Sequence, residues 1–284
     1  MDGIVAGDRE GRSVAAGQRV SARGAVFAPV ISGGRAEAVV QRITESASLG
    51  LLADGEQLPS ESELAAQLGV STVTLREALA ALREQGLVET RRGRKGGSFI
   101  RAPGDPARAS LQARLSGLSV STLRDAGDEL AAVSGAAARL AATRASSDNV
   151  RRLLTLAELV ATADGVSGRT RADSRFHIEV AVAGASERLT RSEVSLQGEL
   201  ALLLWGATGA GDQATAATAA ASAAEQHRAI ALAISREEAG LARELAEQHV
   251  EQNTHRLIEA RIELHGRTGP AGPAGAVSAG RVRQ

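Results

Sequence analysis

The sequence predicts a mainly α-helical protein with an N-terminal winged helix-turn-helix, which carries a small β-hairpin wing, and a C-terminal antiparallel bundle made only of helices. Two observations lead to this fold class. Between residues 36 and 101, three helical patterns with capping signals precede two short strand-like segments. From about residue 118 to 264, apolar residues recur at spacings typical of helices that bury one face. The 284 residues are enough for two domains with ordinary cores.

The first two helices of the N-terminal part are predicted by apolar spacing and by turn residues. The first helix follows from apolar residues three and four apart, at Val40, Ile43, Ala47 and Leu51. Asp54-Gly55 is a turn signal that ends it. Ser60-Glu61-Ser62-Glu63 is a capping box, which starts a short second helix that closes at Gly69.

The third helix and the hairpin follow directly. Ser71 can cap the third helix, whose buried stripe consists of Leu75, Leu79 and Leu82. This helix ends near Gly86, and the segments 87–90 and 98–101 are predicted to be strands around a turn rich in Gly and Arg. A helix, a helix-turn-helix and a hairpin in that order describe a winged helix-turn-helix.

Composition and charge limit the kinds of protein this chain can be. Only 1% of the residues are aromatic, so the cores must be built from Ala, Leu, Val and Ile. The absence of Cys excludes disulfides and thiolate metal sites. The net charge is zero, yet residues 71–101 hold seven basic and three acidic side chains, a local excess that favours a polyanion. We find no apolar run long enough to span a bilayer and no signal-peptide pattern, and therefore expect a soluble, cytoplasmic protein without a membrane partner.

Five segments are expected along the chain. They are a disordered tail (1–34), the winged helix-turn-helix (35–103), a linker that contains Pro106 (104–117), an all-helical domain (118–264) and a second disordered tail (265–284). Within the helical domain, the Ala-, Thr- and Gly-rich stretch 206–224 is expected to be a flexible loop.

Four motifs follow one another in the N-terminal part: Leu58–Ala65, Leu68–Ser71, Thr74–Leu79 and Glu84–Val88. In this order they resemble the GntR family of bacterial transcription regulators, over about residues 36–103. The resemblance implies that the recognition helix places its N-terminal side chains on base edges in the major groove, while the wing contacts phosphates. The candidate residues for contact with double-stranded DNA are Ser60, Ser62, Ser71, Thr72, Val73, Thr74, Arg76, Arg92, Arg94, Lys95 and Gly96.

This sequence departs from the pattern of FadR-type members, which usually have Arg where Ser62 and Thr72 stand. Only Arg76 is retained. Because Ser and Thr cannot reproduce the bidentate pairing of Arg with guanine, we expect an operator that differs from the family's common sequence. The alternative is a basic hairpin on a protein that does not bind DNA.

One carboxylate and three histidines have spacings that suit a single metal site. Asp173 and His177 are four apart, on one face of a helix. His227 and His249 lie on two later helical segments joined by the short junction 235–238, so the second segment should fold back along the first. The alternative is that these are unrelated surface or core histidines.

The order and spacing of these four residues, with Phe176 before the first histidine, resemble the FCD ligand-binding domain of many FadR-type regulators. That resemblance implies a divalent metal ion in the bundle, and one carboxylate with three imidazoles suits zinc, nickel or manganese. Two departures stand out. Ser186 replaces an Asn that is common in the family, and Leu130 and Ser134 stand where Arg and Glu are common.

These features together predict a ligand-responsive transcription regulator and not an enzyme. We expect a repressor that binds a palindromic operator as a homodimer and senses a small carboxylate through the metal. Two other classes remain open at this point: a metal-dependent hydrolase and an architectural protein that binds DNA without sequence preference.

Overall fold

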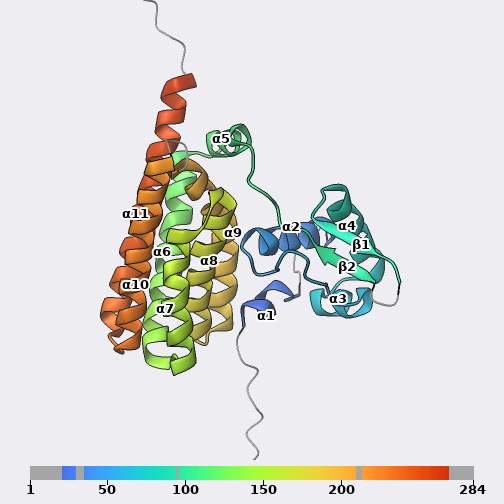
Figure 1. The fold of residues 1–284 in the computed structure, drawn as a ribbon, viewed down its shortest axis with the longest axis horizontal. Helices are drawn as coiled ribbons and strands as arrows, with labels where there is room; N and C mark the ends of the chain where they lie inside the picture. The colour runs from blue at the N-terminus through green and yellow to red at the C-terminus, as the bar shows by residue number, and fades with distance from the viewer. Residues whose placement is uncertain (1–20, 30–34, 94–95, 209–212, 269–284) are drawn as a thin grey trace, which may run out of the picture.

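The computed structural model describes residues 21–29, 35–93, 96–208 and 213–268, which form a winged helix-turn-helix beside a helical bundle (Figure 1). The N-terminal part contains α1 (Ala22–Val26), α2 (Arg35–Ser48), α3 (Glu61–Leu68), α4 (Thr72–Glu84), β1 (Val88–Arg91) and β2 (Gly97–Ile100). Next come α5 (Arg108–Ser116), α6 (Val120–Arg144), α7 (Ser147–Thr162), α8 (Gly165–Ala183), α9 (Glu187–Thr208), α10 (Gln213–Ser235) and α11 (Ala239–Thr268). The fold class expected from the sequence is confirmed.

Local capping starts both helices of the helix-turn-helix. The Ser60 hydroxyl accepts the Glu63 amide at 3.4 Å, and the Glu63 carboxylate accepts the Ser60 amide at 3.0 Å, which completes the expected capping box. Gly69 ends α3 in the left-handed region at φ 67°, where glycine carries no steric penalty. Ser71 then caps α4 by accepting the Thr74 amide at 3.1 Å.

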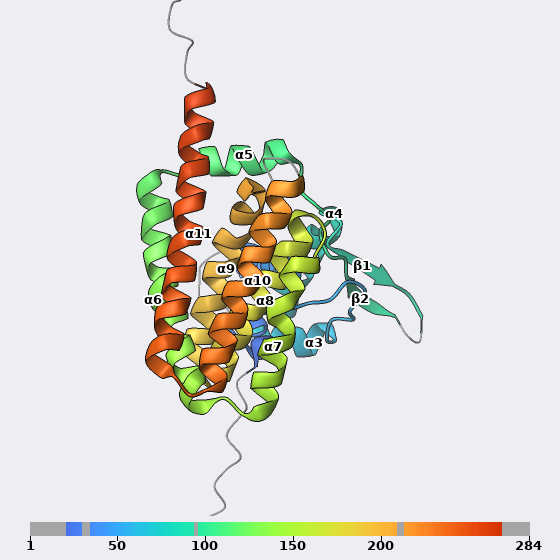
Figure 2. The ribbon, with the colours of Figure 1, turned by 60° about the vertical axis from the view of Figure 1, so that its left-hand side comes forward.

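The hairpin pairs β1 with β2 in antiparallel register, with Val88 opposite Ile100. It projects from the winged helix-turn-helix away from the bundle (Figure 2). Gly96 is needed near its tip, because a Cβ there would lie 2.4 Å from the backbone oxygen of Arg91. Arg94 and Lys95, two of the expected phosphate contacts, lie outside the described residues.

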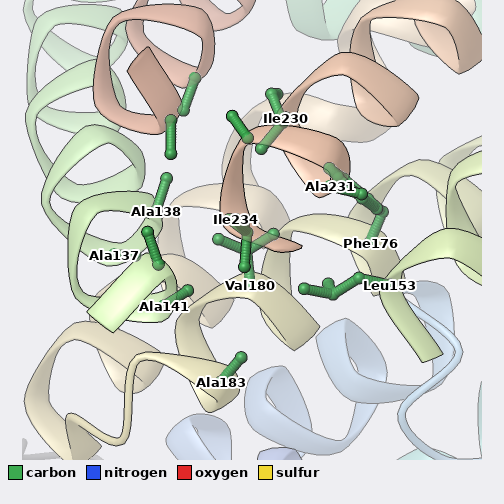
Figure 3. Close-up of a cluster of buried hydrophobic side chains, with 14 of the residues drawn as sticks. Ala137, Ala138, Ala141, Leu153, Phe176, Val180, Ala183, Ile230, Ala231 and Ile234 are labelled. Carbon is green, nitrogen blue, oxygen red and sulfur yellow. The ribbon is translucent and has the colours of Figure 1, made fainter. Parts of the chain in front are cut away.

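Small side chains allow the bundle helices to approach closely. Figure 3 shows one core, to which α6 contributes alanines, α7 Leu153, α8 Phe176 and α10 Ile230, with Val180 and Ile234 lying between the alanines and Phe176. The α6 and α11 helices lie so close that a Cβ on Gly127 would be 2.3 Å from the Thr254 side chain. With almost no aromatic residues available, this close packing supplies the contacts that larger side chains would otherwise make.

The two parts share a buried apolar contact. Leu49, just after α2, packs with Ile178 of α8 and Val194 of α9, and all three are at most 5% exposed. Beside it, the Arg171 side chain lies over Gly50, whose positive φ of 69° favours glycine. The winged helix-turn-helix is therefore docked on the same helix, α8, that carries Asp173 and His177.

The expected N-terminal tail contains a short helix. Although residues 1–20 and 30–34 lie outside the described part, residues 22–26 form α1. Val26 and Phe27 are buried in the core of the winged helix-turn-helix, and α1 also contacts α8 and α9. Ser21 caps α1 by accepting the Gly24 amide at 3.0 Å, but a five-residue helix is not stable by itself, so tertiary packing is needed to form it.

The expected linker also contains a helix, α5. Its two leucines are four apart and both buried: Leu111 contacts Gly206 of α9, and Leu115 joins the core between α6, α9 and α11. Arg261 of α11 donates hydrogen bonds to the backbone oxygens of Ser116 and Leu118, which satisfies the carbonyl end of α5. The neighbouring prolines concealed this helix in the sequence.

The expected loop 206–224 is wrong for most of its length, because α9 continues to Thr208 and α10 begins at Gln213. Ala220, Ala223 and Ala224 of α10 pack on Trp205 and Val160. Alanine has the highest helix propensity, and here it also fits a narrow space between helices. No helix in the described part of the chain is both long and apolar enough to cross a membrane.

Candidate metal centre and DNA-reading surface

Three helices of the bundle bring the four expected ligands together. Asp173 and His177 lie one turn apart on α8, His227 lies on α10 and His249 on α11, and none is more than 5% exposed. The short turn after Ser235 lets α11 fold back along α10, as expected. This fold-back brings His249 of α11 next to His177 of α8 in one buried cluster.

The donor atoms are spaced as they would be around one ion. His177 Nε2 lies 3.2 Å from His249 Nε2, and Asp173 Oδ1 lies 3.3 Å from His227 Nε2 and 3.9 Å from His177 Nε2. All four donors lie within 4.8 Å of one another. An ion about 2.1 Å from each donor would separate neighbouring donors by roughly 3.0–3.4 Å and opposite donors by about 4.2 Å. The cluster can therefore hold a metal ion.

Unsatisfied polar atoms support the same interpretation. Among the described residues, Asp173 Oδ1 and both ring nitrogens of His227 are buried without a hydrogen-bond partner. Buried polar atoms are costly to leave unpaired, and such groups in a folded protein call for an explanation. A bound cation would satisfy Asp173 Oδ1 and His227 Nε2 together.

Burial keeps the imidazoles in the form that binds metal. It lowers the pKa of His177 to about 4 and that of His227 to about 3, and it also lowers the pKa of His249 well below its usual value. All three rings are therefore neutral near pH 7, and each has one unprotonated nitrogen that could ligate an ion.

Two neighbours orient the histidine rings. Gln226 Nε2 donates to Gln252 Oε1 at 2.9 Å, which leaves Gln226 Oε1 to accept a hydrogen bond from the Nδ1–H of His249. His249 Nε2 is thus the unprotonated nitrogen, and it faces the other donors. His227 is held differently: its ring stacks on Phe176 with centroids 4.1 Å apart.

A buried polar network lies on the α9 side of the cluster. Ser134 of α6 donates to the Glu193 carboxylate at 2.9 Å, and Gln197 Nε2 donates to it at 3.0 Å. Gln197 Oε1 in turn accepts from the Ser174 hydroxyl at 3.2 Å. The pKa of Glu193 is raised to about 7: burial is the largest cause, the charge of Asp173 adds to it, and the hydrogen bonds from Gln197 and Ser134 act in the opposite direction.

The raised pKa of Glu193 predicts a pH-dependent stability cost. Between about pH 4.5 and 7 the folded state holds a proton on Glu193 that the unfolded state has released, so stability falls as pH rises through this window. In metal-stripped protein at pH 8, Glu193→Gln should raise the free energy of unfolding by about 1–3 kcal/mol. Urea unfolding at pH 8 and at pH 4 measures this, and the gain should vanish at pH 4.

Glu251→Gln is the matched control for that substitution, because Glu251 is exposed on α11. Its stability difference from the wild type should be the same at both pH values. A gain from Glu193→Gln that is equally large at pH 4 and pH 8 would show that packing, and not ionisation, is responsible.

The structure places the DNA-reading candidates at the N-terminal ends of α3 and α4 and in the hairpin. Val73 is 62% exposed, although it is apolar, and Arg76 extends from the same helix with its side chain 67% exposed. Arg76 Nε donates to Glu61 Oε2 at 2.7 Å, so an acidic residue of α3 holds the guanidinium in place. Arg92 is exposed beyond β1, close to the tip of the hairpin.

Several serine and threonine candidates are engaged with one another. Ser62 Oγ lies 3.2 Å from Ser60 Oγ, and Thr74 Oγ1 lies 2.9 Å from Ser71 Oγ. Ser60 and Ser71 cap the two helices. Ser60, Ser62 and Ser71 are exposed, and Thr74 is half-buried. Thr72 is the first residue of α4 and is also exposed.

Comparison with known proteins assigns both parts of the chain. Residues 35–100 match the bacterial regulatory proteins of the gntR family, and residues 130–252 match the FCD domain. A relative from Mycobacterium gastri, named as the HTH-type transcriptional regulator RmpR, is 38% identical over 84% of this chain and 86% of its own length. The chain belongs to the GntR family. It is a DNA-binding transcription regulator with an FCD ligand-sensing domain, as the motifs indicated.

Two further proteins resemble this GntR-family regulator less closely, one over only part of its sequence and one at low sequence identity. The Glc operon transcriptional activator of Escherichia coli is 37% identical over 38% of this chain and 41% of its own length. The solved structure of E. coli McbR/YncC covers 81% of this chain and 99% of its own, at 16% identity and a TM-score of 0.46. The matching families and relatives are transcription regulators and not enzymes, which argues against the hydrolase alternative.

Leu130 and Ser134, two of the positions at which the sequence analysis noted a departure from the FCD pattern, lie near the cluster. Ser134 is buried and bonded to Glu193, so the buried carboxylate is supplied by α9. Leu130, one turn earlier on α6, lines a cavity that also touches Asp173 and His177. A positively charged side chain is thus absent at this position of the cavity wall.

Some residues of the site had no place in the sequence analysis. Asn253 lies one turn after His249, and its Nδ2 is 3.0 Å from His249 Nε2, so the spacing of four could have indicated it. Gln226 directly precedes His227, but only the pairing of α10 with α11 turns it toward His249. Glu193 carried no local signal, because its partner Ser134 is 59 residues away.

Proposed function

We propose that this GntR-family regulator binds a palindromic operator as a homodimer and represses transcription, and that a divalent metal ion on Asp173, His177, His227 and His249 receives a small carboxylate effector. The observation that carries this proposal is the convergence of four buried ligating atoms, some of them without partners, beside a cavity. When bound, the ion (zinc, nickel or manganese) would offer open coordination positions to an anionic oxygen.

The exposed face of α4 is suited to reading base edges. The methyl groups of Val73 can contact the C5-methyl of thymine, and the Arg76 guanidinium can pair with O6 and N7 of guanine. Since each chain has one recognition helix, two chains related by a two-fold axis would read an inverted repeat. Arg92 is exposed, and its guanidinium would contact a phosphate.

The α8 helix offers a route from effector to DNA. Asp173 and His177 face the cluster, whereas the neighbouring Ile178 packs on Leu49 at the contact with the winged helix-turn-helix. A change at the ion that shifts α8 would alter this contact, and so the relative placement of the two recognition helices in a dimer. The effector must then bind the two arrangements with different affinities.

Operator binding of metal-loaded and metal-stripped protein tests the proposal. An operator is first selected from random DNA with the full-length protein, and binding is followed by fluorescence anisotropy at fixed salt. With zinc bound, at least one of acetate, butyrate, lactate and succinate should weaken operator binding about tenfold, within the usual range of coupling between two sites. Metal-stripped protein should bind the operator but show no response.

Two controls separate this proposal from its alternatives. Random DNA of the same length should bind far more weakly, whereas equal affinity would favour the architectural alternative. Native mass spectrometry of the same sample should report a dimer with one ion per chain. The same acid response in stripped and zinc-loaded protein would rule out the role of the metal.

A further inference from the structure

A small cavity adjoins the candidate metal centre, between α6, α8, α9 and α11. Asp173 and His177 belong to its lining, so the cavity reaches the ligating atoms. Most of the remaining lining is aliphatic and consists of Leu130, Leu200, Ala201, Leu204, Val250 and Leu257. Its volume of about 30 Å³ suits one water-sized group, so a larger molecule must displace side chains of these helices to enter.

The other polar residues of the lining are neutral and largely engaged. Gln197 uses its carbonyl oxygen for Ser174 and one N–H for Glu193, which leaves a single N–H free. Thr254 donates its hydroxyl to the backbone oxygen of Val250 at 2.9 Å. Asn253 turns its amide toward His249. The cavity therefore offers few free donors to a ligand with several hydroxyl groups.

The charge balance permits one carboxylate and disfavours a second. None of the described residues that line the cavity is Arg or Lys. Asp173 supplies the carboxylate of the lining, so a divalent ion beside it leaves one positive charge within the cavity, which one carboxylate neutralises. Glu193 lies outside the lining, where its carboxyl is bonded to Ser134 and Gln197. A second carboxylate on the same molecule would lie among leucine side chains without a cation, and burying an unpaired charge is costly.

We infer that the effector is a monocarboxylate with a short aliphatic body, and neither a dicarboxylate nor a polyhydroxy acid. This inference rests on the proposed function, because the carboxylate would bind at the metal. The aliphatic chain would lie against Leu130, Leu200 and Leu257, where its burial contributes to affinity. Since the cavity is small, the chain has to move these leucines of α6, α9 and α11, and that movement links recognition to a shift of the bundle.

Calorimetric titration of the zinc-loaded full-length protein with acids of equal chain length tests the inference. Butyrate is compared with succinate, and hexanoate with adipate. Each monoacid should bind at least about 100-fold more tightly than its diacid partner, because the diacid buries an unpaired charge. Of the two monoacids, hexanoate should give the more negative heat capacity change on binding, since its longer chain buries more apolar surface than that of butyrate.

Leu130→Arg tests the same point by gain of function. A guanidinium at this position could pair with the distal carboxylate, so succinate should bind about tenfold more tightly than it does to the wild type. Leu159→Arg is the matched control, because Leu159 is 42% exposed on α7 and lies outside the cavity lining. Its replacement should leave the affinities for succinate and for butyrate unchanged. If Leu130→Arg does not fold, the wild-type ratio decides.

The outcomes separate this inference from the proposed function. Diacids that bind as tightly as the monoacids, and only with zinc present, would overturn the inference and leave the proposed function standing. Binding of neither class to zinc-loaded protein would overturn both. If monoacids bind metal-stripped protein as tightly as zinc-loaded protein, the metal takes no part in recognition. This inference would then also be wrong.

Discussion

Replacing His227 by Ala should reduce the bound metal from about one ion per chain to a small fraction, because three remaining donors hold a divalent ion much more weakly than four. Since a ligand that binds only the folded state stabilises it, zinc at 100 times its Kd should raise the free energy of unfolding of the wild type by about 2.7 kcal/mol. The same zinc should have little effect on the variant. Elemental analysis and thermal unfolding with and without zinc measure the two effects.

His255→Ala is the matched control for this prediction. His255 also lies on α11, but its side chain is 74% exposed and pairs with Glu259, outside the cluster. It should keep both the ion and the stabilisation by zinc. Binding of the selected operator by His227→Ala without effector should stay close to that of the wild type. One ion per chain retained by a variant without both His227 and His249 would contradict the site.

Replacing Arg76 by Ala should weaken binding to the selected operator by about 1–3 kcal/mol, which is roughly 5- to 150-fold, if the guanidinium pairs with a guanine. Glu61 holds Arg76 through a 2.7 Å hydrogen bond, so the side chain is oriented before DNA binds. Glu61→Ala should therefore cause a smaller loss of the same kind. Anisotropy titrations of the operator and of random DNA at one salt concentration measure both variants.

Arg83→Ala provides the control on the same helix, because Arg83 is exposed in the last turn of α4, far from the end that carries Val73. It should change operator binding by much less than Arg76→Ala. Losses of equal size on operator and random DNA would reassign Arg76 to a phosphate contact, since phosphates are the same in every sequence.

Sequence alone was sufficient for the winged helix-turn-helix and for the residues of the candidate metal site. Ser60 with Glu63 and Ser71 with Thr74 act within one helical turn, so their capping is encoded locally and appears in the structure as expected. The strands fall within one residue of their predicted positions. The spacing of Asp173 and His177 indicates one helix face, and the structure brings His227 and His249 to it.

Tertiary structure alone decided the features that depend on partners distant in the chain. The α1 and α5 helices are short. Ser21 caps α1 by accepting the Gly24 amide at 3.0 Å, whereas α5 has no side-chain cap. Both helices form where Val26, Phe27, Leu111 and Leu115 find apolar partners. Helix packing likewise joins Ser134 to Glu193 and encloses an aliphatic cavity at Leu130. Local patterns determine where a helix begins and which face it buries. The neighbour that meets this face depends on the packing of the whole chain, and that packing decides which ligand the site can accept.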